Sequence, residues 1–224
     1  MISPSRGEFD KELLVSARAC QVTGFEEKAG ILVPTFSEPT GRVYGYEHPT
    51  KNSIAINRTT PDPWESDLVY VGQSQLEQGG EGLFARRDIP KKKLVSFYNG
   101  VRMNTSSYYA KHLGHSDYRI ALNADFDLDI PFDCVRLEDY CATLAHKVNH
   151  SNLPNTKWVV VEHPRFGLIR GIATAEDIAK DSEILINYHI NLGDAPEWYK
   201  KVWLRHQREF KKMSDESIER FMLR

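Results

Sequence analysis

Apolar residues occur in short runs along most of this chain, and the runs are rich in β-branched and aromatic side chains. Gly, Pro, Asn or Asp residues bound these runs, which is the pattern of short β-strands. The pattern predicts strands at residues 31–36, 41–47, 53–57, 67–75, 93–101, 158–163, 167–175 and 183–188. We therefore expect a mostly β fold of the α+β class.

Helical periodicity is clear in two segments of the chain. The first spans residues 137–148, and the second begins at Pro196, where Asp194 is a candidate N-cap. Both segments are predicted to be amphipathic helices. The apolar residues that share a face are Leu137, Cys141, Leu144 and Val148 in the first helix, and Trp198, Val202 and Trp203 in the second.

Two polar, proline-containing stretches divide the chain. They are TTPDPWESD at residues 59–67 and NLGDAPEW at residues 191–198. Such stretches are typical of boundaries between structural parts. The sequence thus predicts a β-rich N-terminal module at 1–67, a central domain at 68–190 and a helical C-terminal segment at 191–224.

Composition narrows the class of protein. The chain has 224 residues, 41% of them hydrophobic, and a net charge of −2, so it can bury a core and has no overall basic field for nucleic acid. No apolar run approaches the roughly 18 residues of a membrane span, and the N-terminus lacks a signal-peptide core. We expect a soluble, intracellular protein with no membrane or direct nucleic-acid partner. The cysteines form no CxxC pair, so no metal site is expected: Cys20, Cys134 and Cys141.

Four short motifs carry the candidate chemistry. In chain order they are GGEGLFA at 79–85, SFYNGV at 96–101, NHSNLPN at 149–155 and EILINY at 183–188. Each has a plain structural explanation when it is taken alone. A Gly-Gly pair or an Asn-Gly pair fits a tight turn, Asn and His fit the polar end of a helix, and a tyrosine fits the edge of a sheet.

Taken together, the order and spacing of the motifs resemble those of a SET domain, the protein-lysine methyltransferase fold, over residues 68–190. The flanking stretches TPDPWESDLVYV and DAPEWY are similar to the branch in which MORN repeats precede the SET domain. Residues 1–32 resemble at most the last fragment of such a repeat. The resemblance implies a β-clip fold of small curled sheets. It also implies a C-terminal pseudo-knot that brings the NHS turn and the EILINY strand together around one cavity.

The resemblance also implies S-adenosylmethionine as methyl donor and a lysine amine as acceptor. Positioning and electrostatics would carry such an in-line transfer, because it needs no covalent enzyme intermediate. The matching catalytic residues are Tyr188, which would orient the amine and the methyl group, and Tyr98, which would hydrogen-bond the amine. The lysine must first lose its proton, and burial beside a positively charged sulfur favours that loss.

Seven positions match the family's cofactor-binding residues. By resemblance, Gly79, Gly80 and Glu81 would meet the methionine part of the donor through their backbone. Lys147 would pair with its carboxylate and Asn149 would bond its amino group. The His150 backbone would recognise the adenine edge, and Trp198 would cover the adenine face.

Structural explanations remain open for some of these residues. Lys147 could be a lysine favoured by the C-terminus of the predicted helix, and His150 could be a partly buried histidine with satisfied nitrogens. Asn155 fits a residue that holds the crossing loop better than a ligand-binding residue. Three further histidines fit ordinary polar positions: His146, His163 and His189.

The sequence departs from the family pattern at three places. Thr156 stands where relatives often have a zinc-binding cysteine, so no post-SET zinc cluster is expected. Trp158 stands where the MORN-linked branch has a tyrosine in the lysine channel, and Ile190 replaces a second tyrosine. The channel would be lined by Tyr98, Trp158, Tyr188 and Ile190. The larger indole favours transfer of a single methyl group, whereas the loss of a hydroxyl that orders water would act in the opposite direction.

The leading functional prediction is an S-adenosylmethionine-dependent protein-lysine N-methyltransferase. Its partner would be a lysine-containing protein, a histone tail by kinship or a non-histone protein, in the nucleus and/or the cytoplasm. Residues 108–121 match the family's peptide groove poorly, so peptide specificity does not transfer. The alternative is a weakly active or inactive SET-fold module that binds a partner protein, which Trp158 favours and the tyrosine pair opposes.

Overall fold

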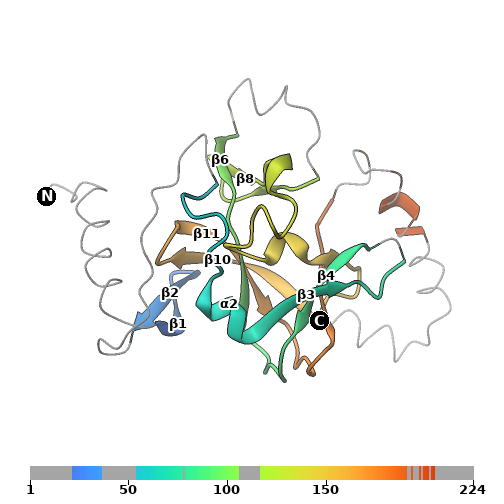
Figure 1. Cartoon of the computed structure of the whole chain (residues 1–224), viewed down its shortest axis with the longest axis horizontal. Helices are drawn as coiled ribbons and strands as arrows, with labels where there is room; N and C mark the ends of the chain where they lie inside the picture. The colour runs from blue at the N-terminus through green and yellow to red at the C-terminus, as the bar shows by residue number, and fades with distance from the viewer. Residues whose placement is uncertain are drawn as a thin grey trace, which may run out of the picture. The chain divides into compact units, whose positions relative to one another are not determined.

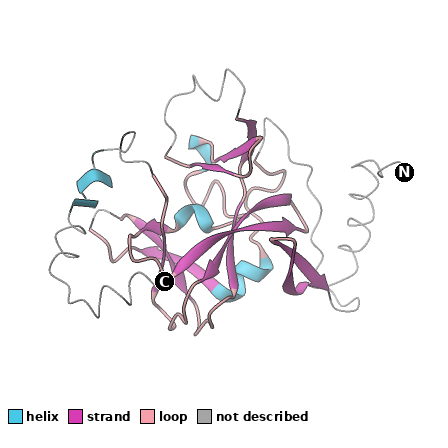
Figure 2. Cartoon of the chain, turned by 180° about the vertical axis from the view of Figure 1, so that it is seen from behind, coloured by secondary structure: helices cyan, strands magenta, loops and turns pink. Residues whose placement is uncertain are grey.

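The computed structural model describes residues 22–36, 54–77, 79–105, 117–190, 193, 197, 199–201, 203 and 204. Strands outnumber helices among these residues, as Figure 2 shows. The expectation of a mostly β fold is therefore confirmed. Within the same residues, no helix is long and apolar enough to cross a membrane.

The described residues belong to two compact units. Unit 1 draws on Met1–Val69, Leu94–His146 and Trp158–Ile172. Unit 2 draws on Tyr70–Lys93, Lys147–Lys157 and Ala173–Arg224. The division at residues 67/68 and 190/191 stays a prediction.

Unit 1 is built on a five-stranded sheet in the order β1-β2-β10-β11-β5 (Figure 1). The strands are β1 Val22–Lys28, β2 Ile31–Phe36, β10 Thr156–His163, β11 Gly167–Thr174 and β5 Leu94–Tyr98. Strands β1 and β2 form an antiparallel hairpin, and β10 runs parallel to β2. Ala29 and Gly30 both have positive φ, at 51° and 77°, which is the turn conformation that matches the twist of a two-residue hairpin.

Unit 1 has a second, three-stranded sheet that the sequence analysis did not predict, since the strand expected at 93–101 reaches only the first residue of this sheet, Val101. It comprises β6 Val101–Asn104, β8 Phe126–Asp129 and β7 Arg119–Ala121, with β8 antiparallel to both neighbours. Leu128 of β8 is fully buried, whereas the aspartates beside it interrupt the apolar run. The strand is therefore short and polar at alternate positions, so it has no apolar run from which it could be predicted.

The polar stretch at residues 59–67 contains a helix, α2, at Pro63–Leu68. The Asp62 side chain caps it by accepting from the backbone N–H groups of Trp64, at 2.9 Å, and Glu65, at 3.1 Å. Pro63 begins the helix, where its missing N–H costs nothing. Asp62 and Glu65 are both buried, so this stretch is part of the core of unit 1.

The helix predicted at residues 137–148 is wrong. Among these residues, all of which the structure describes, the only regular helix is the single 3₁₀ turn η2 at Ala145–Lys147. The backbone N–H groups of Cys141 and Ala142 donate to the Arg58 carbonyl oxygen, and that of Leu144 donates to Glu65. Donors that bond distant partners cannot close an α-helical ladder, and consecutive residues are buried here instead of one face.

The strand predicted at 53–57 is also wrong over its described part. Residues 54–57 form bends, and the carbonyl groups at the two ends of this stretch accept from side chains instead of a neighbouring strand. Asn99 donates to the Ile54 carbonyl oxygen, and Arg165 donates to that of Asn57. The strand predicted at 41–47 lies outside the described residues.

Unit 2 contains a four-stranded sheet in the order β3-β4-β12-β9. Its strands are β3 Val69–Gln73, β4 Glu81–Ala85, β12 Glu183–Ile186 and β9 Asn149–His150. Strand β12 is antiparallel to β4 and parallel to β9. Leu83, Ile184 and Ile186 form its buried core.

The C-terminal segment is helical wherever it is described beyond residue 193. Residues 197, 199–201, 203 and 204 are in α-helical conformation, with Tyr199 buried and Trp203 half-buried. This agrees with the helix predicted from Pro196. The candidate N-cap Asp194 and the predicted adenine contact Trp198 lie outside the described residues.

Candidate functional site

The NHS turn and the EILINY strand lie side by side in unit 2. Asn149 is paired with Leu185 and His150 with Ile186 in a parallel register. The backbone N–H of Ser151 continues the pairing by donating to the Ile186 carbonyl oxygen at 2.9 Å. The expected approach of these two motifs is therefore confirmed, although they are separated by about 30 residues of chain.

Asn155 holds the other end of this pairing. Its Nδ2 donates to the Glu183 carbonyl oxygen at 2.8 Å, and its Oδ1 accepts from the Leu185 backbone N–H at 2.8 Å. The side-chain amide thus takes the place of one residue of a neighbouring strand. This is the structural role that the sequence favours for Asn155.

Tyr188 follows β12 and reaches back to the NHS turn. Its hydroxyl donates to the Val148 carbonyl oxygen at 2.6 Å, and its backbone N–H donates to His150 Nδ1 at 3.2 Å. The Tyr188 and His150 rings have centroids 5.2 Å apart. Asn149, His150 and Tyr188 are therefore neighbours within one unit.

His150 is buried, and aromatic rings lie close to it. Its imidazole centroid is 4.7 Å from the ring of Tyr199 in the C-terminal helix, in addition to its contact with Tyr188. Burial raises the pKa of Tyr199, since an ionised phenol loses hydration there. The imidazole therefore packs against two aromatic rings.

The glycine turn before β4 is held by β3. The Gly80 carbonyl oxygen accepts from the Ser74 backbone N–H at 2.8 Å and from Gln73 Nε2 at 2.9 Å. Gly80 has φ +59°, and a Cβ built on it meets no heavy atom within 4 Å. A positive φ with open space beside it is the backbone feature expected of a turn that a ligand approaches closely.

Lys147 and Glu81 form an ion pair in unit 2. The Lys147 side chain is 6% exposed and the Glu81 side chain is 51% exposed. A nearly buried ammonium group needs an anion beside it, and the more exposed carboxylate supplies one. Lys147 is also the last residue of the 3₁₀ turn η2.

Asn149 connects the glycine turn to β12. Its Nδ2 donates to the Glu81 carbonyl oxygen at 3.0 Å and to Glu183 Oε1 at 3.0 Å. Glu183 was missed in the sequence analysis. The signal that could have found it is a carboxylate at the start of an otherwise apolar strand, EILI, where an acid needs hydrogen-bond donors around it.

Two of the predicted channel residues lie together in unit 1. Tyr98 ends β5, is buried, and donates its hydroxyl hydrogen to the Tyr118 carbonyl oxygen at 2.6 Å. Trp158 of β10 packs edge-on against the Tyr98 ring, with centroids 5.8 Å apart and planes at 74°. Tyr188 and Ile190, the other predicted channel residues, belong to unit 2, where Ile190 is half-buried.

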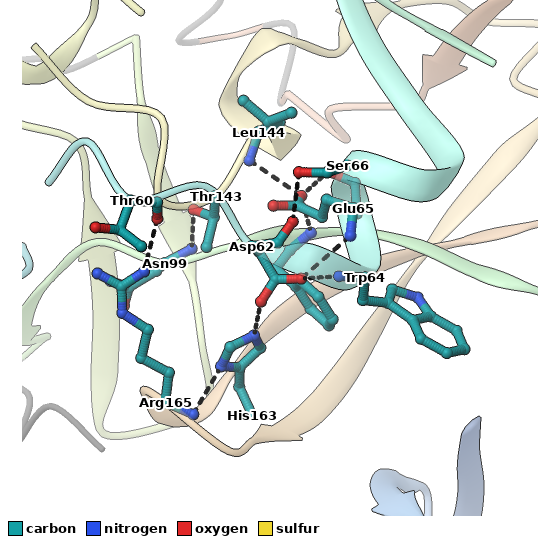
Figure 3. A network of polar contacts seen from close by, with 12 residues as sticks. Thr60, Asp62, Trp64, Glu65, Ser66, Asn99, Thr143, Leu144, His163 and Arg165 are labelled. Carbon is teal, nitrogen blue, oxygen red and sulfur yellow. Dashed lines mark hydrogen bonds and ion pairs between the residues drawn. The ribbon is translucent and has the colours of Figure 1, made fainter. Parts of the chain in front are cut away.

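A buried polar network fills the centre of unit 1 (Figure 3). His163, fully buried, accepts from the Arg165 backbone N–H through Nδ1 at 3.0 Å, so its Nε2 donates to Asp62 Oδ2 at 3.1 Å. The interpretation of His163 as an ordinary polar position is therefore wrong. Short-range sequence patterns cannot show a partner 101 residues away.

Glu65 lies at the same centre and joins three segments. Its Oε1 accepts from the Ser96 hydroxyl, from the Phe97 backbone N–H at 2.7 Å and from the Leu144 backbone N–H at 3.0 Å. Complete burial, and the nearby charge of Asp62, raise the pKa of Glu65 well above its usual range. Glu65 therefore anchors β5, the strand that ends in Tyr98.

Part of this chain, which contains most of the four motifs, is similar to known proteins. Residues 80–189 match the family model of the SET domain. The chain is 34% identical over 204 residues to the histone-lysine N-methyltransferase SETD7 of Halocynthia roretzi, covering 87% of this chain and 53% of that protein. It thus spans about half the length of this curated relative.

Solved structures with a similar arrangement come from polycomb repressive complex 2. One is the Chaetomium thermophilum complex in an autoinhibited conformation bound to S-adenosylmethionine, with 21% identity and a TM-score of 0.43 over 63% of this chain and 17% of that chain. Another is an active complex in the basal state, with 25% identity and a TM-score of 0.43 over 55% of this chain and 15% of that chain.

Proposed function

We propose that this chain, whose residues 80–189 match the SET domain, is a protein-lysine N-methyltransferase that uses S-adenosylmethionine. The observation that carries the proposal is the parallel pairing of β9 with β12, which groups Asn149, His150 and Tyr188 in unit 2. The identity to a histone-lysine methyltransferase over most of this chain supports the same reaction class.

The residues of unit 2 suit the amino-acid part of S-adenosylmethionine. Lys147 offers a nearly buried cation for its carboxylate, which would share the lysine with Glu81. The amide oxygen of Asn149 offers an acceptor for its ammonium group. The open space beside Gly80 admits a ligand against the backbone of residues 79–81. When bound, this cofactor would supply an electrophilic methyl group on a positively charged sulfur.

The adenosyl part would be held by two further residues. We assign the adenine edge to the His150 backbone and the adenine face to Trp198. The packing of the His150 ring against Tyr188 and Tyr199 would hold that backbone in place. Replacement of Trp198 tests the second assignment, because loss of a stacked ring would weaken binding of every adenosyl compound.

The two proposed catalytic tyrosines can each bind a lysine amine, the group that accepts the methyl. The hydroxyl hydrogens of Tyr98 and Tyr188 are each donated to a backbone carbonyl oxygen at 2.6 Å. Each phenol oxygen is then an acceptor toward a ligand, and a lysine amine carries N–H donors. We propose that Tyr188 orients the amine for transfer and that Tyr98 limits its freedom. The amine must arrive neutral, from an unperturbed pKa of about 10.4, and burial lowers that value.

The proposed substrate is a lysine-bearing protein. The name of the curated relative supports histone tails, and non-histone proteins fit the same chemistry. The corresponding sites of action are the nucleus and/or the cytoplasm. The half-buried Trp158, packed against Tyr98, would set how many methyl groups the amine can accept.

A direct experiment measures donor binding and methyl transfer together. Calorimetry with S-adenosylmethionine tests the pocket, and transfer from radiolabelled donor to histones and to an array of lysine peptides tests the reaction. We expect binding and label on at least one lysine substrate. Folded protein that neither binds the donor nor labels any substrate would overturn the proposal.

The second candidate is a partner-binding module without turnover. The observation that favours it is the edge-on packing of Trp158 on Tyr98, which places a bulky indole beside a proposed catalytic phenol. Donor binding without label on any substrate, together with indifference to Tyr188→Phe, would select this candidate.

A further inference from the structure

Glu183 is a buried carboxylate that the sequence analysis did not assign to the site. It is the first residue of β12 and is 7% exposed. No cation among the described residues is paired with it. A buried acid without a cation is stabilised only by the hydrogen bonds it accepts, so these bonds define its role.

The Glu183 carboxylate accepts three hydrogen bonds in unit 2. Its Oε1 accepts from the Ser74 hydroxyl at 2.7 Å and from Asn149 Nδ2 at 3.0 Å. Its Oε2 accepts from the Gln75 backbone N–H at 2.9 Å. One side chain thus joins the end of β3, the start of β9 and the start of β12.

These contacts fix the orientation of the Asn149 side-chain amide. Nδ2 donates one hydrogen bond to the Glu81 carbonyl oxygen and another to the Glu183 carboxylate. Both partners can only accept, so the amide nitrogen must face them, and a flipped amide would set oxygen against oxygen. The Asn149 oxygen is consequently turned away from Glu183.

Two glycines leave the room that this arrangement needs. A Cβ at Gly82 would overlap Glu183 Oε1, and a Cβ at Gly79 would overlap the Ser74 hydroxyl. At both positions it would also lie 3.2 Å from Asn149 Nδ2. The glycines around β4 therefore serve the side-chain cluster of Ser74, Asn149 and Glu183 as well as the backbone turn.

We propose that Glu183 is a positioning residue, which holds the Asn149 amide with its oxygen directed to the ammonium group of the methyl donor. This inference rests on the proposed function. It adds that recognition of the ammonium group depends on a carboxylate that does not itself contact the donor.

The variant Glu183→Gln tests this dependence without a change of shape. The glutamine amide has one oxygen and one nitrogen where the Glu183 carboxylate has two oxygens. The Gln75 N–H can only donate and so claims that oxygen, whereas the Ser74 hydroxyl can accept from the new amide nitrogen. The amide nitrogen then faces Asn149 Nδ2, which keeps only the Glu81 carbonyl oxygen as an acceptor. The Asn149 amide therefore reorients, and its oxygen leaves its position.

Calorimetry with three ligands distinguishes positioning from general support of the pocket. S-adenosylmethionine carries the ammonium and the carboxylate, its decarboxylated form carries only the ammonium, and 5′-methylthioadenosine carries neither. We expect Glu183→Gln to lower the affinity for S-adenosylmethionine and for its decarboxylated form about tenfold, which corresponds to one hydrogen bond to a charged group. The affinity for 5′-methylthioadenosine should change less than twofold. Equal weakening of all three, or no weakening of the first two, would overturn the inference.

A double-mutant cycle tests the route through Asn149. In the Asn149→Ala background, Glu183→Gln should change the affinity for S-adenosylmethionine less than twofold, because there is no amide left to orient. A tenfold loss that persists in this background would contradict the inference. Ser74→Ala is the matched control, since it removes one donor to Glu183 and leaves Asn149 its acceptor; it should leave all three affinities within twofold.

Glu183→Asp covers the case in which Glu183→Gln does not fold. It keeps the charge and withdraws the carboxylate from Asn149 by one methylene, so the same ligand-selective loss is expected. If the wild-type protein binds none of the three ligands, the proposed function itself fails, and that outcome is separate from a wild type that binds while the Glu183 variants bind equally well.

Discussion

The hydroxyl group of Tyr188 donates its hydrogen to the carbonyl oxygen of Val148 at 2.6 Å. The phenol at the end of β12 is thereby tied to the residue that precedes β9, and its oxygen is left to act as an acceptor. A side chain held in this way has a fixed position before any ligand arrives, which is what a reaction governed by positioning requires.

Tyr188→Phe should therefore separate activity from stability. Loss of the oxygen should reduce methyl transfer on the order of 100-fold, in the range seen when a positioned polar group is removed from an active site. Loss of the bond to Val148 should lower the free energy of unfolding by only about 1 kcal/mol. Radiolabelled transfer and urea unfolding measure the two effects.

The matched control for this prediction is Tyr140→Phe in unit 1. Tyr140 is fully buried and its hydroxyl bonds the Thr143 hydroxyl at 2.8 Å. This change should lower stability by a similar amount and leave the transfer rate within about twofold. A rate loss as large as that of Tyr188→Phe would show that the assay reports folding instead of chemistry.

Glu65 gives a prediction about pH. Burial first, and Asp62 second, raise its pKa in the folded protein. An unfolded glutamate has a pKa of about 4.3. The folded state therefore holds the proton more tightly, so the contribution of Glu65 is fully present below that value and is lost as pH rises toward the folded pKa.

Glu65→Gln is neutral at every pH, so it should lack this loss. Its stability relative to wild type should increase between pH 4 and pH 8, by about 1.4 kcal/mol for each unit by which the pKa of Glu65 is raised. Urea unfolding at several pH values measures the difference. Glu65→Ala should instead cost about 3 kcal/mol or more at each pH, because it leaves the Phe97 and Leu144 N–H groups without an acceptor. Parallel pH curves for wild type and Glu65→Gln would refute the prediction.

His163 and His189 form a matched pair for testing the buried network. His163→Asn removes the donor to Asp62 and the acceptor for the Arg165 N–H, so it should lower the free energy of unfolding by about 3 kcal/mol. His189→Asn changes an exposed residue with φ +53°, a conformation that asparagine tolerates, and should stay within about 0.5 kcal/mol. Chemical unfolding of both variants decides; equal effects would mean that the network adds nothing to stability.

Asn155 should matter more than its neighbour Asn152 in the same turn. Asn155→Ala removes both bonds to the β12 backbone and should cost about 2 kcal/mol. Asn152 Nδ2 is buried without a hydrogen-bond partner, so Asn152→Ala should be within about 0.5 kcal/mol of wild type. Hydrogen exchange at the Leu185 N–H gives a local readout: it should become faster in Asn155→Ala and stay unchanged in Asn152→Ala.

The sequence could predict the strands with long apolar, β-branched runs and the pairing of the NHS turn with β12, because these signals are local or carried by recognisable motifs. β-branched runs marked β10, β11 and β12, and the order of the four motifs indicated which distant segments meet. The assignments to donor and substrate stay predictions, and the structure adds the hydrogen bonds that hold Tyr98, Asn149 and Tyr188 in place.

The wrong helix and the wrong interpretation of His163 share one physical cause, which is long-range hydrogen bonding. Residues 137–148 have helical spacing, yet Arg58 and Glu65 accept their backbone hydrogens and exclude the helix. The same applies to His163, whose partner Asp62 lies in a stretch that was interpreted as a boundary. Short-range sequence patterns do not indicate such partners. The one sequence feature that could have indicated them is a carboxylate in apolar surroundings.

The internal position of Glu65 sets a limit on how the gene can be shortened. A fragment expressed from residue 80, where the family match begins, or from residue 68, would lack the carboxylate that secures β5. It would also lack the carbonyl of Asn57, on which the Arg165 guanidinium rests. Anyone trimming this polypeptide for crystals or for display should keep the stretch from about residue 54 onward, or supply it as a separate peptide.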